Sequence, residues 1–314
     1  MSLLSVIIPS YNEENNFSTA VQRLSEVLTA AKIEYELIFV DDGSRDKTYA
    51  LICEEARKNS AVRGISFSRN FGKEAAIFAG LHEAKGDACV VTDCDMQFPP
   101  EVIVQMWELW QQGYQVVEGK KSSRGKEHVA HGLFARLFYR LIGQAVGMDM
   151  QSSSDFKLLD RRVVDALNAL QERDTFFRAL SFWAGFRTAT VEFEVQPRKN
   201  GTSKWSIRKL VRYAINNLTS FSTAPLRVIT FLGAVLLIGS AVLALQTLVR
   251  FFMGTAVEGF TTVILLLLLI GGAIMVSLGI IGHYIGRIYD EVKKRPRYIV
   301  ARRTEEEETR AIDA

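Results

Sequence analysis

The residues best suited to chemistry form a short acidic stretch, Asp93-Cys94-Asp95-Met96-Gln97, after an apolar run. In an extended chain, residues two apart face the same way, so Asp93, Asp95 and Gln97 are predicted to point at one ligand. Hard oxygen ligands of this kind suit Mg²⁺ or Mn²⁺, and such an ion would neutralise charge on a departing diphosphate. The alternative interpretation is a strand-end turn with capping carboxylates.

Two further polar segments suggest nucleotide or phosphate chemistry. In Asp41-Asp42-Gly43-Ser44, the aspartates can accept from a base N–H or a ribose hydroxyl, although an ordinary Asp-Gly turn is equally compatible. Arg69 and Lys73 flank Gly72 ahead of a predicted helix, and cations beside helix-terminal amides favour phosphate. No Gly-x-Gly-x-x-Gly follows a strand and no Walker A motif occurs, which argues against a dinucleotide oxidoreductase.

Alternating strand and helix patterns are expected to bring these segments together. The predicted strands are Leu4–Ile8, Glu36–Val40, Val62–Phe67, Ala88–Thr92 and Gln115–Val117, and the predicted helices are Glu14–Ala31, Lys47–Asn59, Lys73–Ala84 and Glu101–Gln111. Such alternation implies an α/β fold with a parallel sheet covered on both faces, and ligands bind beyond the carboxyl ends of such strands. Because four polar segments follow four predicted strands, a single site is expected. Later in the chain, helices over Leu133–Gly143 and Arg161–Leu170 and a strand over Thr188–Val195 are predicted.

The last third of the sequence predicts a membrane anchor. Val228–Val249 and Phe260–Gly282 contain no charged residue, and each is as long as the roughly 20 residues that a membrane span requires. Before them, Trp205–Phe221 has one apolar helical face and a basic remainder, which predicts an interfacial helix, with an ordinary surface helix as the alternative. Lys and Arg are dense on both outer flanks, which puts both ends in the cytoplasm. The tail after Pro296 is expected to be disordered.

Composition adds little about partners. The 314 residues carry a formal net charge of +3, and the cysteines, Cys53, Cys89 and Cys94, match no zinc spacing, so they are interpreted as reduced and incidental. Since no signal peptide is visible, the N-terminal domain is expected to stay in the cytoplasm. The predicted division is a catalytic domain over 1–204, an amphipathic interfacial helix over 205–224, a two-helix transmembrane hairpin over 225–287 and a cytoplasmic tail over 288–314.

Four motifs together resemble a known family. Pro9-x-Tyr11-Asn12-Glu13, Asp41-Asp42-Gly43-Ser44, Asp93-x-Asp95-x-Gln97 and Arg198-x-x-Gly201-x-Ser203-Lys204 are similar to those of inverting family 2 glycosyltransferases with a GT-A fold. Within that family the chain resembles dolichyl-phosphate mannose synthases and, more closely, the GtrB-like bacterial bactoprenol glucosyltransferases. The resemblance covers roughly residues 3 to 290, including the amphipathic helix and the pair of membrane helices.

The resemblance implies a role for each motif. A nucleotide sugar would be bound by Pro9, Tyr11, Asn12, Glu13, Asp41, Asp42, Arg69, Lys73 and Asp93, with Mg²⁺ or Mn²⁺ held by Asp93, Asp95 and Gln97. The phosphate of a polyprenyl phosphate lipid would be bound by Arg124, Arg136, Arg198, Ser203 and Lys204, of which Arg124 and Arg136 can also be read as solvated surface residues. Asp95 and Asp155 are the candidate catalytic residues.

The role of Asp155 stays open between a base and an orienting group. A phosphate monoester has its second pKa near roughly 6, so the acceptor needs little deprotonation at neutral pH. Lys157, where relatives often carry arginine, belongs to the same segment. The expected reaction is one in-line displacement at the anomeric carbon that inverts it, with positioning and charge stabilisation as the main contributions.

Several alternatives remain at the level of sequence. Glucose from UDP-glucose is the favoured donor, with GDP-mannose, UDP-N-acetylglucosamine and UDP-amino-arabinose open. A processive polysaccharide synthase is disfavoured, since no Gln-x-x-Arg-Trp motif occurs and only two spans are predicted. A non-catalytic nucleotide-sensing membrane protein would be expected to lose the metal carboxylates, and a small transporter would carry charges inside its spans. No nucleic-acid partner is expected, and the resemblance implies a homo-oligomer, a tetramer, in the inner or plasma membrane.

Overall fold

The computed structural model describes residues 2–121, 154–170, 172, 176–194, 224–253 and 259–306. The chain forms two compact units, residues 1–210 with 296–314, and residues 211–295. The predicted helix over 133–143 and the predicted amphipathic helix over 205–221 lie outside the described residues.

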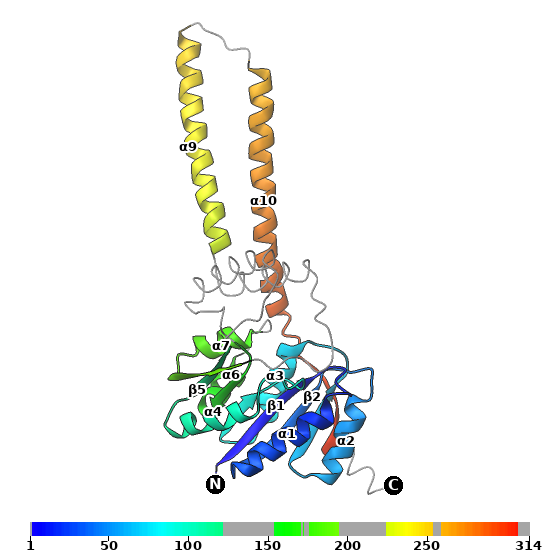
Figure 1. The fold of residues 1–314 in the computed structure, drawn as a ribbon. Helices are drawn as coiled ribbons and strands as arrows, with labels where there is room; N and C mark the ends of the chain where they lie inside the picture. Colours follow the sequence, from blue (N-terminus) through cyan, green and yellow to red (C-terminus); the bar gives the residue numbers. More distant parts are fainter. Residues whose placement is uncertain are drawn as a thin grey trace. The chain divides into compact units, whose positions relative to one another are not determined.

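A mixed sheet forms the centre of the first unit, with the strand order β7-β5-β6-β4-β1-β2-β3-β8 among the described residues (Figure 1). Its strands are β1 (Leu3–Ser10), β2 (Glu34–Asp41), β3 (Val62–Phe67), β4 (Ala88–Val91), β5 (Val116–Lys121), β6 (Lys157–Asp160), β7 (Thr188–Phe193) and β8 (Val300–Arg303). The predicted parallel pairing holds for β1 to β4 and for β5 with β7. β6 and β8 pair antiparallel with their neighbours, so the sheet is mixed rather than parallel throughout.

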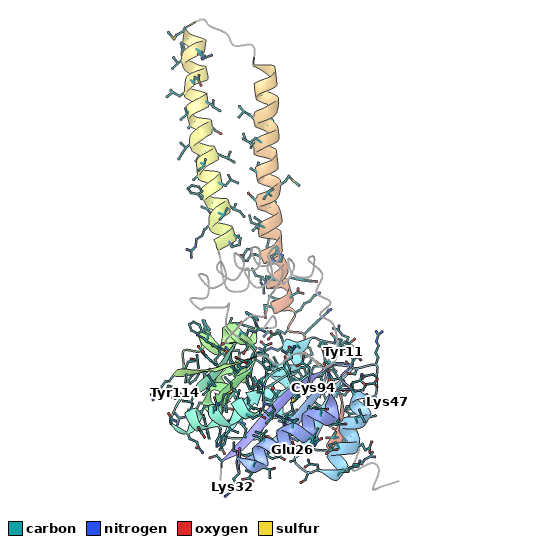
Figure 2. The ribbon with its side chains drawn as sticks, viewed as in Figure 1. Tyr11, Glu26, Lys32, Lys47, Cys94 and Tyr114 are labelled. Carbon is teal, nitrogen blue, oxygen red and sulfur yellow. The ribbon has the colours of Figure 1, made fainter. Side chains whose placement is uncertain are left out.

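Helices cover both faces of this sheet because successive strand residues point to opposite sides. The helices are α1 (Phe17–Ala30), α2 (Thr48–Lys58), α3 (Lys73–Glu83), α4 (Glu101–Gln111), α6 (Arg161–Ala169) and α7 (Phe177–Trp183). α1, α2 and α4 share one core cluster with Leu4, Val6 and Ile8. α3 packs on the other face, where a Cβ at Gly80 would lie 2.2 Å from a side-chain carbon of Ile7. In Figure 2, Tyr11 and Cys94 mark the carboxyl end of the strands and Lys32 the amino end.

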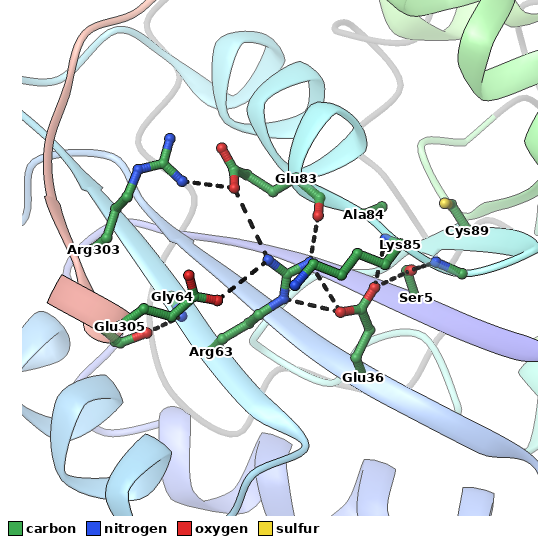
Figure 3. A network of polar contacts seen from close by, with 12 residues as sticks. Ser5, Glu36, Arg63, Gly64, Glu83, Ala84, Lys85, Cys89, Arg303 and Glu305 are labelled. Atoms are coloured by element: carbon green, nitrogen blue, oxygen red, sulfur yellow. Dashed lines mark hydrogen bonds and ion pairs between the residues drawn. The ribbon is translucent and has the colours of Figure 1, made fainter. Parts of the chain in front are cut away.

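The C-terminal segment is part of the sheet, so the prediction of a disordered tail was wrong for residues up to 306. β8 pairs antiparallel with β3, and Thr304 Oγ1 accepts a hydrogen bond of 3.1 Å from the amide of Gly64. Arg303 forms an ion pair of 2.7 Å with Glu83 of α3 (Figure 3). Without β8, the edge strand β3 would leave backbone N–H and C=O groups without hydrogen-bond partners. Pairing with these groups orders the segment despite the polar tail that predicts disorder.

The second unit contains two long antiparallel helices, α9 (Ala224–Phe252) and α10 (Phe260–Val292) (Figure 1). Two windows, Pro225–Leu243 and Leu269–Val292, are long and apolar enough to cross a membrane, and no part of either is buried within the structure. Apolar side chains without protein cover suit a lipid environment better than water. Length and composition are therefore consistent with the predicted hairpin.

Candidate active site

Four loops meet where the parallel strands end, as predicted. β1, β2, β3 and β4 lie side by side and run in one direction. The polar segments that follow them therefore share one edge of the sheet. All the candidate residues from Pro9 to Gln97 lie in or beside these loops.

Asp41 and Asp42 tie the loops together. Asp41 accepts from Ser66 Oγ at 2.6 Å, while Asp42 accepts from the amides of Phe71 and Gly72 at 2.6 and 2.9 Å. Burial raises the pKa of Asp42, and the two amide donors oppose that shift. A Cβ at Gly43, whose φ is +66°, would lie 2.6 Å from the backbone carbon of Arg69, so glycine permits this close approach. Sequence reasoning placed these aspartates at the nucleotide; here both carboxylates also hold neighbouring protein groups.

The first loop presents an aromatic ring to solvent. Tyr11 is 43% exposed, while its neighbours are fixed: Asn12, with φ of 56°, donates its amide to Ser44 Oγ at 2.9 Å, and the Glu13 amide donates to Thr48 Oγ1 at 2.9 Å. Pro9 lies within β1. A rigid loop that exposes one aromatic face is suited to stacking on a planar base.

The acidic stretch is a turn, so the prediction of an extended geometry was wrong. β4 ends at Val91, Met96 has a φ of 56°, and its amide lies 3.4 Å from the carbonyl oxygen of Asp93. The Gln97 amide donates to Asp95 Oδ1 at 3.2 Å. Local hydrogen bonds between side chain and backbone favour such a turn over a continued strand. Cys94 within it is buried and free, as are Cys53 and Cys89.

Lys73 joins two carboxylates at the centre of the site. Its Nζ lies 2.6 Å from Asp93 Oδ1 and 2.9 Å from Asp155 Oδ2. Arg178 approaches Asp155 from the other side, with Nε 2.5 Å from Oδ1 and Nη2 3.1 Å from Oδ2. Burial by itself would raise the pKa of Asp155, but Lys73 and Arg178 hold it well below its ordinary value. Burial likewise opposes the charge on Lys73, whose pKa Asp93 and Asp155 nevertheless raise.

Arg178 was missed by sequence reasoning, because no motif surrounds it and its position depends on how α7 is anchored. The Glu74 carboxylate accepts from the amide of Phe177 at 2.8 Å, at the start of α7. Lys157, only 1% exposed, donates to Ser181 Oγ at 2.9 Å and pairs with Glu118 at 3.3 Å. Lys157 thus supports α7 from the interior.

The carboxylates present fit a divalent ion in part. Throughout the described ranges, no group of three His, Cys, Asp or Glu side chains is placed to hold a metal. Mg²⁺ commonly uses only one or two protein carboxylates and completes its shell with water and phosphate oxygens, so Asp93 and Asp95 are sufficient in chemistry and number.

Among the remaining candidates, exposed Arg69 lies with its guanidinium 4.2 Å from the ring centre of Phe71. The candidates Arg124, Arg136, Arg198, Ser203 and Lys204 lie outside the described residues.

Comparisons with known proteins agree with the sequence resemblance. The family model described as glycosyl transferase family 2 matches residues 5–149. A protein described as an uncharacterized glycosyltransferase from Synechocystis sp. is 40% identical, over 95% of this chain and 94% of that protein. A bactoprenol glucosyl transferase of Shigella phage SfII is 37% identical, over 95% of this chain and 97% of its own length. A prophage bactoprenol glucosyl transferase homolog of Escherichia coli is 36% identical, over 95% and 98%.

Among solved structures, one similar chain is glucosyl-3-phosphoglycerate synthase from Mycobacterium tuberculosis in complex with Mn²⁺, UDP-glucose and phosphoglyceric acid. It shares 21% sequence identity, covers 69% of this chain and 79% of its own, and has a TM-score of 0.48.

Proposed function

The chain belongs to glycosyl transferase family 2, and from this premise we propose that it transfers a hexose, with inversion, from a nucleotide sugar to a polyprenyl phosphate. UDP-glucose and undecaprenyl phosphate are the favoured pair. Relatives named bactoprenol glucosyl transferases, 36–37% identical over 95% of this chain, support this choice. The GT-A domain supplies the site, and α9 and α10 supply two helices that suit a membrane.

The observation that carries the proposal is the cluster of Asp93, Lys73, Asp155 and Arg178 at the carboxyl ends of the strands. In the proposed reaction, an acceptor phosphate oxygen forms a bond to the anomeric carbon while the bond to the diphosphate oxygen breaks. The electron pair leaves with the nucleoside diphosphate. Lys73 is proposed to stabilise charge on that leaving group.

Asp155 is proposed as a positioning residue rather than a base. Its carboxylate oxygens are engaged by Lys73 and Arg178, and its pKa is held below the ordinary value. A group so weakly basic is a poor proton acceptor, whereas the acceptor phosphate is largely dianionic at neutral pH, with a second pKa of roughly 6.

Asp93, Asp95 and Gln97 are proposed to hold Mg²⁺ or Mn²⁺, which when bound would neutralise charge on the diphosphate. Tyr11 is proposed to stack on the base, with Pro9, Asn12, Glu13, Asp41, Asp42 and Arg69 around the rest of the donor. Arg124, Arg136, Arg198, Ser203 and Lys204 remain predicted ligands of the lipid phosphate. A multi-pass location with a cytoplasmic catalytic domain, and a tetramer, are proposed on the family resemblance.

The test is a transfer assay on membranes that contain the full chain, with Mg²⁺ or Mn²⁺, undecaprenyl phosphate and a panel of labelled UDP- and GDP-sugars. We expect labelled lipid from UDP-glucose, lost with EDTA and lowered at least roughly 100-fold in Asp95→Ala, the scale expected when charge stabilisation is removed. Label from GDP-mannose, UDP-N-acetylglucosamine or UDP-amino-arabinose alone would change the donor. Nucleotide binding without transfer from any donor would favour a non-catalytic nucleotide sensor, and full activity in Asp95→Ala would refute its metal role.

A further inference from the structure

A segment far along the chain packs against one of the site loops. Arg297–Thr304, here called the return segment, follows α10 and forms β8 against β3. Its pairing extends past the end of β3, because the amide of Ser68 donates to the carbonyl of Ile299 at 3.0 Å. Ser68 is the first residue of the loop that leads to Lys73, so the return segment contacts the site loop directly.

Aromatic side chains add further contacts between the return segment and residues 68–72. The Tyr298 ring stacks on Phe67, with ring centres 5.0 Å apart and planes 15° apart. Phe67, which is buried, meets Phe71 edge to face at 5.7 Å. Arg69 in turn lies over the Phe71 ring at 4.2 Å. The side chains of the loop thus rest on a stack that begins at Tyr298.

The same loop holds the Asp41–Ser44 turn. Phe71 and Gly72 donate their amides to Asp42, and the loop backbone at Arg69 approaches Gly43 closely enough to exclude a Cβ. A displacement of residues 68–72 would therefore release Asp42 and move the start of α3, which carries Lys73. Through this loop, the contacts of Tyr298 influence the positions of Asp42 and Lys73, two proposed donor-binding residues.

The return segment is also anchored at its two ends. Arg297 lies over Phe78 of α3 at 4.8 Å and donates to the carbonyl of Glu172 at 2.7 Å. At the other end, Arg303 pairs with Glu83 (Figure 3). Thr304 accepts a hydrogen bond from the amide of Gly64. With both ends fixed to the catalytic unit, the middle of the segment is a firm support for the loop.

We propose that the return segment is a positioning element for nucleotide-sugar binding, an inference that rests on the function proposed above. Through Tyr298 and Ile299 it fixes Phe67 and Ser68, and so holds residues 68–72 in the arrangement that engages Asp42. Tyr298 acts through these residues and does not itself touch the donor.

The experiment compares Tyr298→Ala, Tyr298→Leu and Tyr298→Phe in the full chain by two readouts. Amide hydrogen exchange at Phe71 and Gly72 is measured without ligand, and KM and kcat are measured for the nucleotide sugar. In the Ala and Leu variants we expect faster exchange and a donor KM raised roughly 2- to 10-fold, the range for loss of one aromatic pair, with the lipid KM unchanged. Tyr298→Phe keeps the ring and should restore both readouts.

Arg302→Ala is the matched control, because this side chain of the same segment lies over Tyr49 of α2 at 4.2 Å and not against Phe67. It should change neither readout. Unchanged exchange and unchanged donor KM in both Tyr298→Ala and Tyr298→Leu would overturn the inference, as would a uniform loss of stability with no change specific to residues 68–72. If the wild-type chain transfers no sugar, the proposed function fails, whereas hydrogen exchange still decides whether Tyr298 holds residues 68–72 in place.

Discussion

The two ends of the parallel strands carry charge networks made from similar side chains, yet the networks differ in exposure. At the amino end, Glu36 accepts from Ser5 Oγ at 2.6 Å, from the Lys85 amide at 2.7 Å and from Arg63 Nε at 2.9 Å (Figure 3). At the carboxyl end, the Nζ atom of Lys73 forms ion pairs with the carboxylates of Asp93 and Asp155. The Arg63 and Glu36 side chains are 17% and 12% exposed, whereas those of Lys73 and Asp93 are 42% and 27% exposed. Asp155, the other partner of Lys73, is 8% exposed and also pairs with Arg178.

The difference in exposure suggests that the two networks have different roles, one in stability and the other in function. Carboxylates that are buried and surrounded by backbone, hydroxyl and guanidinium donors stabilise the fold, since losing one donor leaves a buried group unsatisfied. The side chains of Lys73 and Asp93 are only partly buried, so a ligand can reach them, and such a pair contributes less to stability than a fully buried one. The amino-end network should therefore matter for folding and the carboxyl-end network for catalysis.

The largest effect is expected for Lys73→Met. We expect transfer to fall roughly 100-fold, because removal of one charge-stabilising group costs about that much. The stability should change by less than about 1 kcal/mol, since the lost pair with Asp93 is partly exposed and the buried Asp155 keeps both hydrogen bonds from Arg178. The measurements are kcat/KM for the nucleotide sugar and the thermal midpoint of the full chain. Lys58→Met, which removes an exposed pair with Glu54 on α2, is the control and should alter neither quantity. A large loss of stability in Lys73→Met would contradict the comparison.

Arg63→Met is expected to lower the stability and to leave the kcat unchanged. Loss of the guanidinium leaves Glu36 and the carbonyl of Glu83 short of a donor, and we expect a destabilisation of about 1–3 kcal/mol. Thermal unfolding should report it, at roughly 2–4 °C for each kcal/mol in a domain of this size. The kcat of the folded fraction should match wild type. Arg23→Ala, which breaks an exposed pair with Glu101, is expected to cost no more than about 1 kcal/mol. If Arg63→Met lowers kcat without lowering stability, the two ends are not separable in this way.

The same contrast explains how much the sequence could predict. The elements β1 to β4 and the loops after them follow from local pattern, because apolar runs and helical spacing are properties of neighbouring residues. Convergence of Asp42, Lys73 and Asp93 followed in turn from the parallel order of the strands. At Asp95 the favoured extended geometry was wrong and the alternative, a strand-end turn, is what forms. The local bond between the Gln97 amide and the Asp95 carboxylate competes with strand extension and leaves no periodic pattern.

Contacts between distant segments could not be predicted in this way. Arg178 reaches Asp155 from α7, which Glu74 and Lys157 anchor, and neither Arg178 nor Glu74 lies in a recognisable motif. β8 joins β3 although 232 positions separate the last residue of β3, Phe67, from Ile299, the residue before β8. Its four residues, Val-Ala-Arg-Arg, are too few to show a strand pattern, and the run of glutamates after them predicts disorder. Pairing of this kind depends on an open sheet edge, which exists only once the rest of the sheet has formed.

The smallest expected effect concerns pH and tests whether the carboxyl-end network also carries some stability. Burial, with a further contribution from Asp155, raises the pKa of Glu74 from 4.5 to about 7. Between these values the folded chain keeps a proton that the unfolded chain has released, so this contribution to stability is present below pH 4.5 and is lost as pH rises to about 7. Glu74→Gln keeps an acceptor for the Phe177 amide and stays neutral at every pH.

Between pH 5 and pH 6, inside that window, we expect the thermal midpoint of the wild-type chain to fall relative to Glu74→Gln by roughly 2–4 °C, because a single titrating group changes the stability by about 1 kcal/mol per pH unit there. The midpoint is measured at several pH values from 5 to 8, with Glu26→Gln on the exposed side of α1 as the control that should keep the wild-type slope. Parallel curves for wild type and Glu74→Gln would mean that Glu74 is ionised throughout. Arg178 and Lys73 would then have to balance the negative charge of Glu74. Arg178 would stabilise the carboxylates of both Asp155 and Glu74, just as Lys73 pairs with both Asp93 and Asp155.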